Sequence, residues 1–285
     1  MDNTTQNSYH THISSKHNAL ELKLDEVWRY RDLILLFTKR NFVVRYKQTI
    51  LGPAWILLNP LFSSIIYAIV FGGIAKIGTE GIPTILFYLC SNAIWLFFAT
   101  CVTTNARTFT ENANVFGKVY FPRLTMPISN MLSAGIHFCV QMLMVLGFLG
   151  FYLVQGAVHP NWAAWLLIPV VLLHLGMLGL GCGIIVSSLT TKYRDLAILV
   201  DFAMQLWMYA TPVVYPLSTL EPGWIRTILL INPVTAPVEF FRYAILGQGS
   251  ILPGVLALSW AITIGVMLIG IVIFNKVERT FMDTV

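Results

Sequence analysis

The chain has 285 residues, of which 56% are hydrophobic and only 11% are charged. Soluble domains carry about 25% charged residues, so this composition excludes an ordinary soluble protein and indicates a polytopic membrane protein. The net charge of +5 does not indicate nucleic acid as a partner, because the basic residues form no single patch and accompany no reader motif.

Residues 1–23 are rich in Asn, Thr, Ser, Gln and His, and this composition predicts a disordered tail. His10, His12 and His17 could hold a metal at the surface, but a polar tail without ligands is the favoured interpretation. The apolar core of a cleavable signal peptide is missing, so we expect the first membrane span to direct insertion.

Residues 24–52 predict an amphipathic interface helix followed by a basic segment. Asp25 and Glu26 lie near the start of this helix and Lys39 and Arg40 near its end, the charge order that a helix macrodipole favours. Apolar residues recur at three- and four-residue intervals, so one face of the helix is apolar. We therefore expect this helix to lie on a surface.

Six apolar segments follow, each of about 20 residues or more, the length that crosses a hydrocarbon core about 30 Å thick. They comprise residues 53–75, 85–104, 127–153, 162–188, 196–215 and 255–274. Irregular backbone cannot face lipid, so these segments predict helices. The expected fold is an all-α transmembrane domain over 53–275 with a short tail over 276–285.

The Lys and Arg residues are distributed unevenly between the two sides that six spans define. Fifteen of the 18 fall in the N-terminal segment, the second and fourth connections and the C-terminal tail. The other three are Lys76, Arg226 and Arg242. The positive-inside rule therefore predicts that both termini, and with them the N-terminal tail, are cytoplasmic.

Two connections are too long to be simple turns. Residues 105–126, on the cytoplasmic side, predict a short helix along the membrane face that would contact a cytoplasmic partner. On the outer side, the apolar pieces 224–231 and 238–246 are separated by Asn232 and Pro233. Each piece is too short to span, so we expect both to dip into the membrane and return, or to lie at the interface.

Ionisable groups within the spans are the first candidates for function. For His137 and His174, hydrogen bonding across helices is favoured over a functional role. Asp201 follows Arg194 by seven residues on one helical face, so it either pairs with an arginine at the inner interface or lines a polar path. Pro212 should kink the fifth span and free backbone carbonyls there.

Aromatic residues are abundant in the first, second and fifth spans. Most Trp and Tyr residues in membrane proteins are interfacial anchors. Trp95 and Trp207, however, lie deeper than an anchor, and aromatic rings stack on sugars, so a path for a carbohydrate polymer is a second interpretation. The candidates for that path are Tyr67, Trp95, Phe98, Trp207, Tyr209 and Tyr215.

The remaining patterns bear on packing and chemistry. Gly179, Gly183 and Ser187 form a row of small residues that suits close helix packing, either within the chain or in a dimer. The four cysteines lie in apolar runs without CxxC spacing, so neither disulfides nor a metal site is expected. The sequence contains no catalytic cluster and no GxxxxGK[ST] phosphate loop, so we expect no enzymatic activity, and any energy source must lie elsewhere.

Several short motifs occur in an order that resembles one family, the type-2 ABC exporter permeases for polysaccharides. The resemblance covers nearly all of the chain after the tail. The motifs are Arg45-Tyr46-Lys47, Leu51-Gly52-Pro53-Ala54-Trp55, Asn59-Pro60, Lys118 with Phe121-Pro122-Arg123, Tyr193-Arg194-Asp195, Thr211-Pro212 with Tyr215-Pro216, and Asn232-Pro233.

The resemblance implies a homodimeric permease in the bacterial inner membrane, bound to two copies of a separate subunit that holds ATP and Mg. It implies that the substrate is a polysaccharide on a lipid carrier, commonly undecaprenyl diphosphate, with O antigen preferred over capsule or teichoic acid. Exporters of a small drug or lipid share the topology and remain an alternative. A multispan lipid or glycan transferase is a third possibility, although Asp195 and Asp201 do not cluster with histidines.

Roles for individual residues follow from the resemblance as hypotheses. The diphosphate head group would meet Arg45, Lys47 and Arg123, because guanidinium and ammonium groups bind phosphate favourably. The alternative for all three is a charge that only sets the membrane topology. An inner gate would comprise Arg194, Asp195 and Asp201. Coupling to the ATP-binding subunit would involve Trp28, Arg31, Phe109, Glu111, Phe116 and Lys118.

Overall fold

The computed structural model describes residues 24–116, 118–119, 121–190, 193, 195–249 and 251–284. Within these ranges every regular element is a helix, as the all-α prediction requires. The predicted N-terminal tail with His10, His12 and His17 lies outside the described residues, and so does Arg194 of the predicted inner gate.

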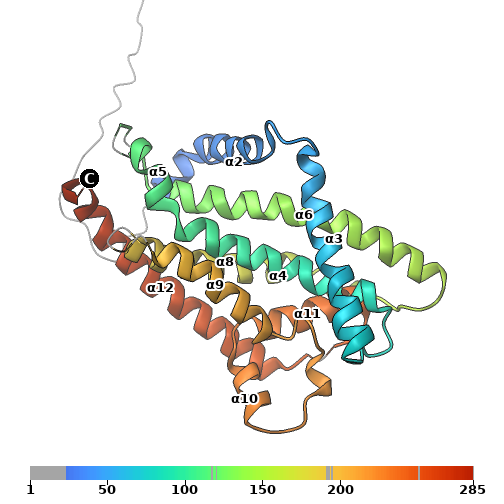
Figure 1. The fold of residues 1–285 in the computed structure, drawn as a ribbon. Coiled ribbons are helices and arrows are strands. Elements are labelled where there is room, and N and C mark those ends of the chain that lie inside the picture. The colour runs from blue at the N-terminus through green and yellow to red at the C-terminus, as the bar shows by residue number, and fades with distance from the viewer. Residues whose placement is uncertain are drawn as a thin grey trace, which may run out of the picture.

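The N-terminal segment forms two helices, α1 (Leu24–Arg29) and α2 (Arg31–Tyr46). Helix α2 lies along the first half of α6 (Thr125–Val154), as Figure 1 shows. The Thr38 hydroxyl donates to the Ser129 carbonyl at 3.4 Å, and Asn41 Nδ2 donates to Asn130 Oδ1 at 2.9 Å. These contacts fix α2 to the bundle on one side.

Among the described residues, five helical runs are long and apolar enough to cross a membrane, and they match the first, second, third, fourth and sixth predicted spans. They comprise Gly52–Ile74, which includes α3 (Trp55–Tyr67), α4 (Thr84–Ala106), α6, α8 (Ile168–Thr190) and residues Pro253–Val277 of α12 (Pro253–Thr284). The predicted fourth span began too early. Trp162–Trp165 forms a separate short helix, α7. Helix α8 starts at Ile168, so Pro169 lies in its first turn, where a backbone N–H would have no partner within the helix and its absence is tolerated.

The predicted fifth span, 196–215, is helical over a shorter stretch than expected. Helix α9 (Leu196–Tyr209) has 14 residues and rises about 21 Å, less than a hydrocarbon core of about 30 Å. It ends before Thr211 and Pro212. The segment nevertheless lies along α4. Asp201 forms an ion pair with Arg107, just after α4 ends, and the Trp207 ring centroid lies 5.3 Å from that of Phe98, midway along α4.

Two shorter helices, α10 (Trp224–Ile231) and α11 (Thr235–Leu246), follow α9 and meet at an angle of 85°. They match the two predicted apolar pieces, with the bend at Asn232 and Pro233. Figure 1 shows α11 lying against the bundle and α10 at its lower edge. Almost all of α11 is buried, so this helix belongs to the core.

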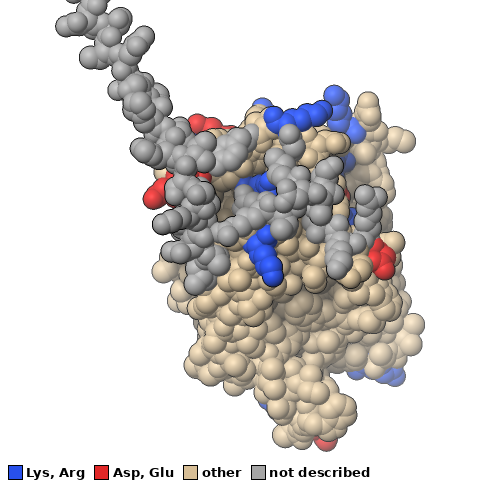
Figure 2. Space-filling model, turned by 90° about the vertical axis from the view of Figure 1, so that its left-hand side faces the viewer, with Lys and Arg blue, Asp and Glu red and all other residues tan. Residues whose placement is uncertain are grey.

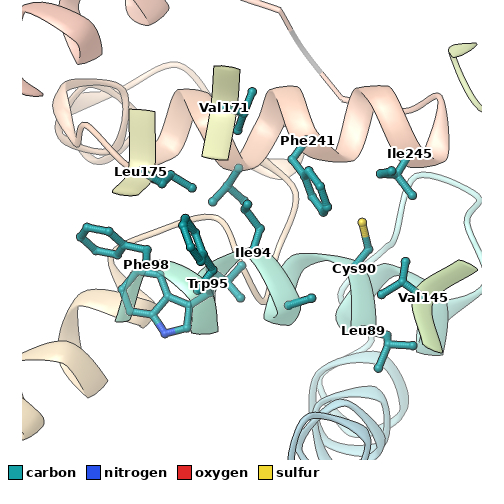
Figure 3. Close-up of a cluster of buried hydrophobic side chains, with 14 of the residues drawn as sticks. Leu89, Cys90, Ile94, Trp95, Phe98, Val145, Val171, Leu175, Phe241 and Ile245 are labelled. Atoms are coloured by element: carbon teal, nitrogen blue, oxygen red, sulfur yellow. The ribbon is translucent and has the colours of Figure 1, made fainter. Parts of the chain in front are cut away.

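Helix α4 is the centre of the bundle, and its residues are buried along most of its length (Figure 3). It packs closely on α8 through glycine. A Cβ atom added to Gly179 would lie 2.6 Å from Cys101 Cβ, and one added to Gly183 would lie 2.4 Å from Asn105 Cβ. The row of small residues therefore serves packing within the chain.

A second apolar cluster lies at the end of the bundle that holds α5 (Thr108–Phe116). Phe109 and Phe116 are buried there with Phe37 of α2 and Phe274 of α12. The rings of Phe109 and Phe274 stack with centroids 5.1 Å apart. These contacts anchor α5 to the helices beside it, and the described C-terminal end lies close by (Figure 1).

Candidate functional site

A cavity of about 530 Å³ lies between α2, α4, α5 and α6, and we call it the α2–α6 cavity. Ten of its 13 lining residues have polar or charged side chains, which is unusual in so apolar a chain. Helix α2 contributes Arg40, Asn41 and Arg45, and α6 contributes Asn130, Ser133 and His137. Helix α5 adds Glu111 and Asn112.

A chain of amide groups organises one wall of the α2–α6 cavity. Arg40 Nη2 donates to Asn41 Oδ1 at 3.2 Å and to Asn112 Oδ1 at 3.3 Å. Asn41 donates to Asn130 Oδ1, and Asn130 donates to Asn105 Oδ1 at 3.2 Å. The network joins α2, α4, α5 and α6, so it holds the Arg40 guanidinium in one place.

His137 forms part of the opposite wall. Its side chain is only 9% exposed, and neither ring nitrogen makes a hydrogen bond with the described residues. The ring stacks beside Phe42 and meets the edge of Tyr46, with centroids 5.7 Å apart in both pairs. Burial raises the pKa of the Tyr46 phenol, although the neighbouring Arg45 opposes this, so the phenol is neutral at physiological pH.

The three predicted head-group residues lie in different surroundings. Arg45 lines the α2–α6 cavity, and Lys47 is exposed just after α2 ends. Arg123 is only 9% exposed and its guanidinium lies 5.8 Å from the Phe116 ring centroid, so it packs against α5. The structure thus brings Arg45 together with Arg40 rather than with Arg123.

Sequence reasoning treated Arg40 only as a helix-end charge, and it missed the cavity. One signal could have revealed it. Asn130, Ser133 and His137 recur at three- and four-residue spacing within an apolar span, so they form a polar stripe on one face of α6. Such a stripe in a membrane helix predicts a polar neighbour or a ligand.

The predicted coupling residues divide into an exposed and a buried set. Trp28, Arg31, Glu111 and Lys118 are exposed, and the Trp28 side chain is 71% exposed. Phe109 and Phe116 are buried in the second apolar cluster. The α5 segment therefore presents polar side chains outward while its aromatic rings fix it to the bundle.

The predicted inner gate is described in part. Asp201 forms an ion pair with Arg107, which follows α4, and both side chains are partly exposed. The sequence had placed Arg194 as the nearest arginine, but that residue lies outside the described ranges. Asp195 is exposed at the start of α9.

The predicted path aromatics occupy two environments. Trp95 and Phe98 are buried in the core, with ring centroids 5.6 Å apart, beside Ile94 and Leu175 (Figure 3). Trp207 Nε1 donates to Asn232 Oδ1 at 3.1 Å. The remaining three are partly or largely exposed: Tyr67, Tyr209 and Tyr215.

The break after α9 frees backbone carbonyls, as Pro212 predicts. Asn232 Nδ2 donates to the Ala210 carbonyl at 2.7 Å, and Arg242 Nη1 donates to the Pro212 carbonyl at 2.9 Å. Asn232 therefore binds the end of α9 from the bend between α10 and α11, and Arg242 binds it from within α11.

A buried ion pair, Glu239 with Arg242, lies in α11, and sequence reasoning missed it. The two side chains are 4% and 0% exposed. The Arg242 guanidinium also lies 4.8 Å from the Phe87 ring centroid. The sequence had counted Arg242 as one charge in an outer loop, because apolar composition alone gives no warning that a loop residue is buried.

His174 makes the interhelical hydrogen bonds that the sequence favoured. Its Nε2 lies 2.9 Å from Thr263 Oγ1 and 3.1 Å from Ser259 Oγ, both on α12. The ring stacks on Trp260 with centroids 4.1 Å apart. In the part of the chain that the structure describes, no group of three His, Cys, Asp or Glu side chains could hold a metal ion.

Comparisons with known proteins match most of the chain. The sequence model of the family described as ABC-2 type transporter matches residues 32–246. Two proteins from Klebsiella pneumoniae named O-antigen export system permease protein RfbA are each 28% identical, over 257 and 253 residues. In both cases the match covers 88% of this chain and 94% of the relative. A protein of the same name from Myxococcus xanthus is 28% identical over 221 residues, covering 76% of this chain and 81% of the relative.

Proposed function

The chain belongs to the ABC-2 type transporter family, and from that premise we propose that it is the permease subunit of an O-antigen exporter. The observation that carries the proposal is the match to relatives named O-antigen export permeases over 94% of their length. The substrate is a polysaccharide linked to undecaprenyl diphosphate. Two copies of the chain form the conduit in the bacterial inner membrane, and a separate subunit binds ATP and Mg.

The distribution of charge supports a cytoplasmic location for the end of the bundle that carries α1, α2 and α5. Figure 2 views this end and shows Lys and Arg across its upper part above a largely uncharged surface. Basic residues are retained on the cytoplasmic side of membrane proteins. Both termini are then cytoplasmic, and the bent pair α10–α11 forms a re-entrant hairpin at the outer side.

Coupling to the ATP-binding subunit involves the exposed residues of α1, α2 and α5. Trp28 and Arg31 offer one contact surface, and Glu111 and Lys118 offer another. Phe109 and its neighbours fix α5 to the bundle, so a push on α5 moves helices rather than a loose loop. This arrangement supports the transmission of force from nucleotide-driven closure of the partner.

The lipid-linked substrate approaches from the cytoplasmic side. Arg45 and Lys47 attract its diphosphate, because charge-assisted hydrogen bonds to phosphate are strong. Arg123 contributes positive potential from its buried position against Phe116. Asp195 and the Asp201–Arg107 pair form the inner gate, and the glycan passes the partly exposed rings of α3, α9 and the loop that follows α9.

Complementation tests this function. The chain and its ATP-binding subunit are expressed in a bacterium that assembles lipid-linked O antigen in the cytoplasm but lacks its own permease. We expect surface O antigen to appear, and to disappear when the ATP-binding subunit cannot hydrolyse ATP. Normal protein levels without surface polymer would contradict the proposal, and export of a small dye instead would identify a drug or lipid exporter.

A further inference from the structure

We propose that the α2–α6 cavity is a phosphate-binding site that receives the diphosphate of the lipid-linked substrate, with Arg40 and Arg45 as its cationic ligands. The inference rests on the proposed function and assigns it a specific site. Arg40 and Arg45, which the fold brings together, bind the diphosphate directly, while Lys47 and Arg123 attract it from a greater distance.

The charges of the cavity favour an anion. Two guanidinium groups face it, from Arg40 and Arg45, and Glu111 is the one acidic side chain among the described lining residues. Guanidinium groups present a planar fork of donors that matches phosphate oxygens in pairs. Glu111 would contact the sugar hydroxyls rather than the phosphate, because a carboxylate repels an anion and accepts hydrogen bonds.

The Arg40 side chain is already positioned for such a ligand. Its Nη2 is held by Asn41 and Asn112, so its other donors have a fixed direction. The guanidinium also lies over the Phe37 ring, 4.8 Å from its centroid, and this cation–π contact further restrains it. A side chain ordered before binding loses less conformational entropy when the ligand arrives.

His137 points independently to a ligand. Its ring lines the cavity, is nine-tenths buried, and makes no hydrogen bond within the described chain. Buried polar groups in native proteins are paired with protein, water or ligand. Both ring nitrogens are covered by neighbouring atoms, so the ring must rotate toward the cavity before an oxygen of the diphosphate or of the first sugar can accept from its N–H.

The size and place of the cavity fit this ligand class. A volume of about 530 Å³ lies within the range of small-molecule sites, and it admits a diphosphate with its first sugar. The cavity lies where α2 meets α5, the two elements proposed to contact the ATP-binding subunit. A bound diphosphate would strengthen the link that Arg40 and Asn112 already make between them.

The test measures binding to the complete exporter in lipid nanodiscs, with undecaprenyl diphosphate, undecaprenol and inorganic pyrophosphate as probes. We expect the R40Q/R45Q variant to bind undecaprenyl diphosphate at least tenfold more weakly than the unmodified protein. The R40K/R45K variant keeps the charge but loses the fork, so its affinity should fall between the two. The matched control R29Q/K39Q removes the same charge outside the cavity and should change affinity less than twofold.

The outcomes separate the site from the function. If unmodified exporter binds undecaprenyl diphosphate no better than undecaprenol, the proposed function itself fails. If it binds but R40Q/R45Q and R29Q/K39Q weaken binding equally, the site is wrong while the function stands. Pyrophosphate binding that equals undecaprenyl diphosphate binding, and that depends on Arg40 and Arg45, would assign the site to a free phosphate and overturn the lipid-linked source.

Discussion

At the scale of single residues, the least expected feature is the charged pair buried in α11. Transfer of two charges out of water is expensive, and the attraction between them compensates only when other partners satisfy the remaining donors and acceptors. Arg242 meets this condition in part: it donates to the Pro212 carbonyl and lies over the Phe87 ring, but its Nε has no hydrogen-bond partner among the described residues. Glu239 accepts from the Leu217 amide. The pair therefore joins α11 to the segment after α9.

Removal of one member of this pair should destabilise the protein strongly. R242M leaves Glu239 buried without its cation, so we expect the free energy of unfolding to fall by about 3–5 kcal/mol. The measurement is reversible unfolding of purified protein in mixed micelles with increasing dodecyl sulfate.

Two further variants make this prediction specific. The E239M/R242M variant removes both charges and should recover most of the loss, because an apolar pair of similar volume carries no unpaired charge. R226M removes a partly exposed arginine of α10 and should change stability by less than about 1 kcal/mol. An R242M loss no larger than that of R226M would contradict the role given to the pair.

At the scale of helices, the sequence predicted the positions of the long apolar helices. It did not predict features that depend on contacts between segments distant in the chain. The predicted spans over α4, α6 and α12 agree with the structure, because no other conformation satisfies their backbone in lipid. The sequence did not predict that α9 ends at Tyr209. The carbonyls freed there accept hydrogen bonds from Asn232 and Arg242, which are distant in sequence, so the local sequence does not reveal them. Likewise, the α2–α6 cavity was not predicted, because its lining residues come from four different helices.

The row of small residues on α8 leads to a prediction at this scale. The amino-acid sequence left open whether Gly183 faces a helix of the same chain or of a second copy. The structure places it against α4 of the same chain. In G183A the new Cβ would lie 2.4 Å from Asn105 Cβ and 2.9 Å from the Val102 carbonyl oxygen. We expect the free energy of unfolding to fall by about 2–3 kcal/mol, measured in the same micelles.

A matched glycine provides the control for this variant. A Cβ added to Gly265 of α12 meets no atom within 4 Å. G265A should therefore be neutral or stabilise the helix by up to about 1 kcal/mol, because alanine favours the helix over glycine. Equal losses in G183A and G265A would show that close contact with α4 is not the cause.

At the scale of the whole molecule, the number of crossings decides where the termini lie. Five long helices alone would leave the two ends of the chain on opposite sides of the membrane. We expect residues 196–215 to add a sixth crossing, although only 14 of them are in helix α9. Contacts at the two ends of the segment support this. Asp201 pairs with Arg107 beyond one end of α4, and Pro212 accepts from Arg242, which lies over Phe87 near the other end. Ser218 then donates to Glu80, which lies in the connection after the first span.

Cysteine labelling tests this topology. In a background without the four native cysteines, S218C and Q155C should react with a membrane-impermeant maleimide in intact spheroplasts, because both positions are exposed at the outer end. N114C and R29C should react only after permeabilisation. Q155C and N114C calibrate the two sides, since the first three spans place them independently of α9. Protection of S218C together with N114C would mean that α9 does not carry the chain across, and the C-terminus would then lie outside.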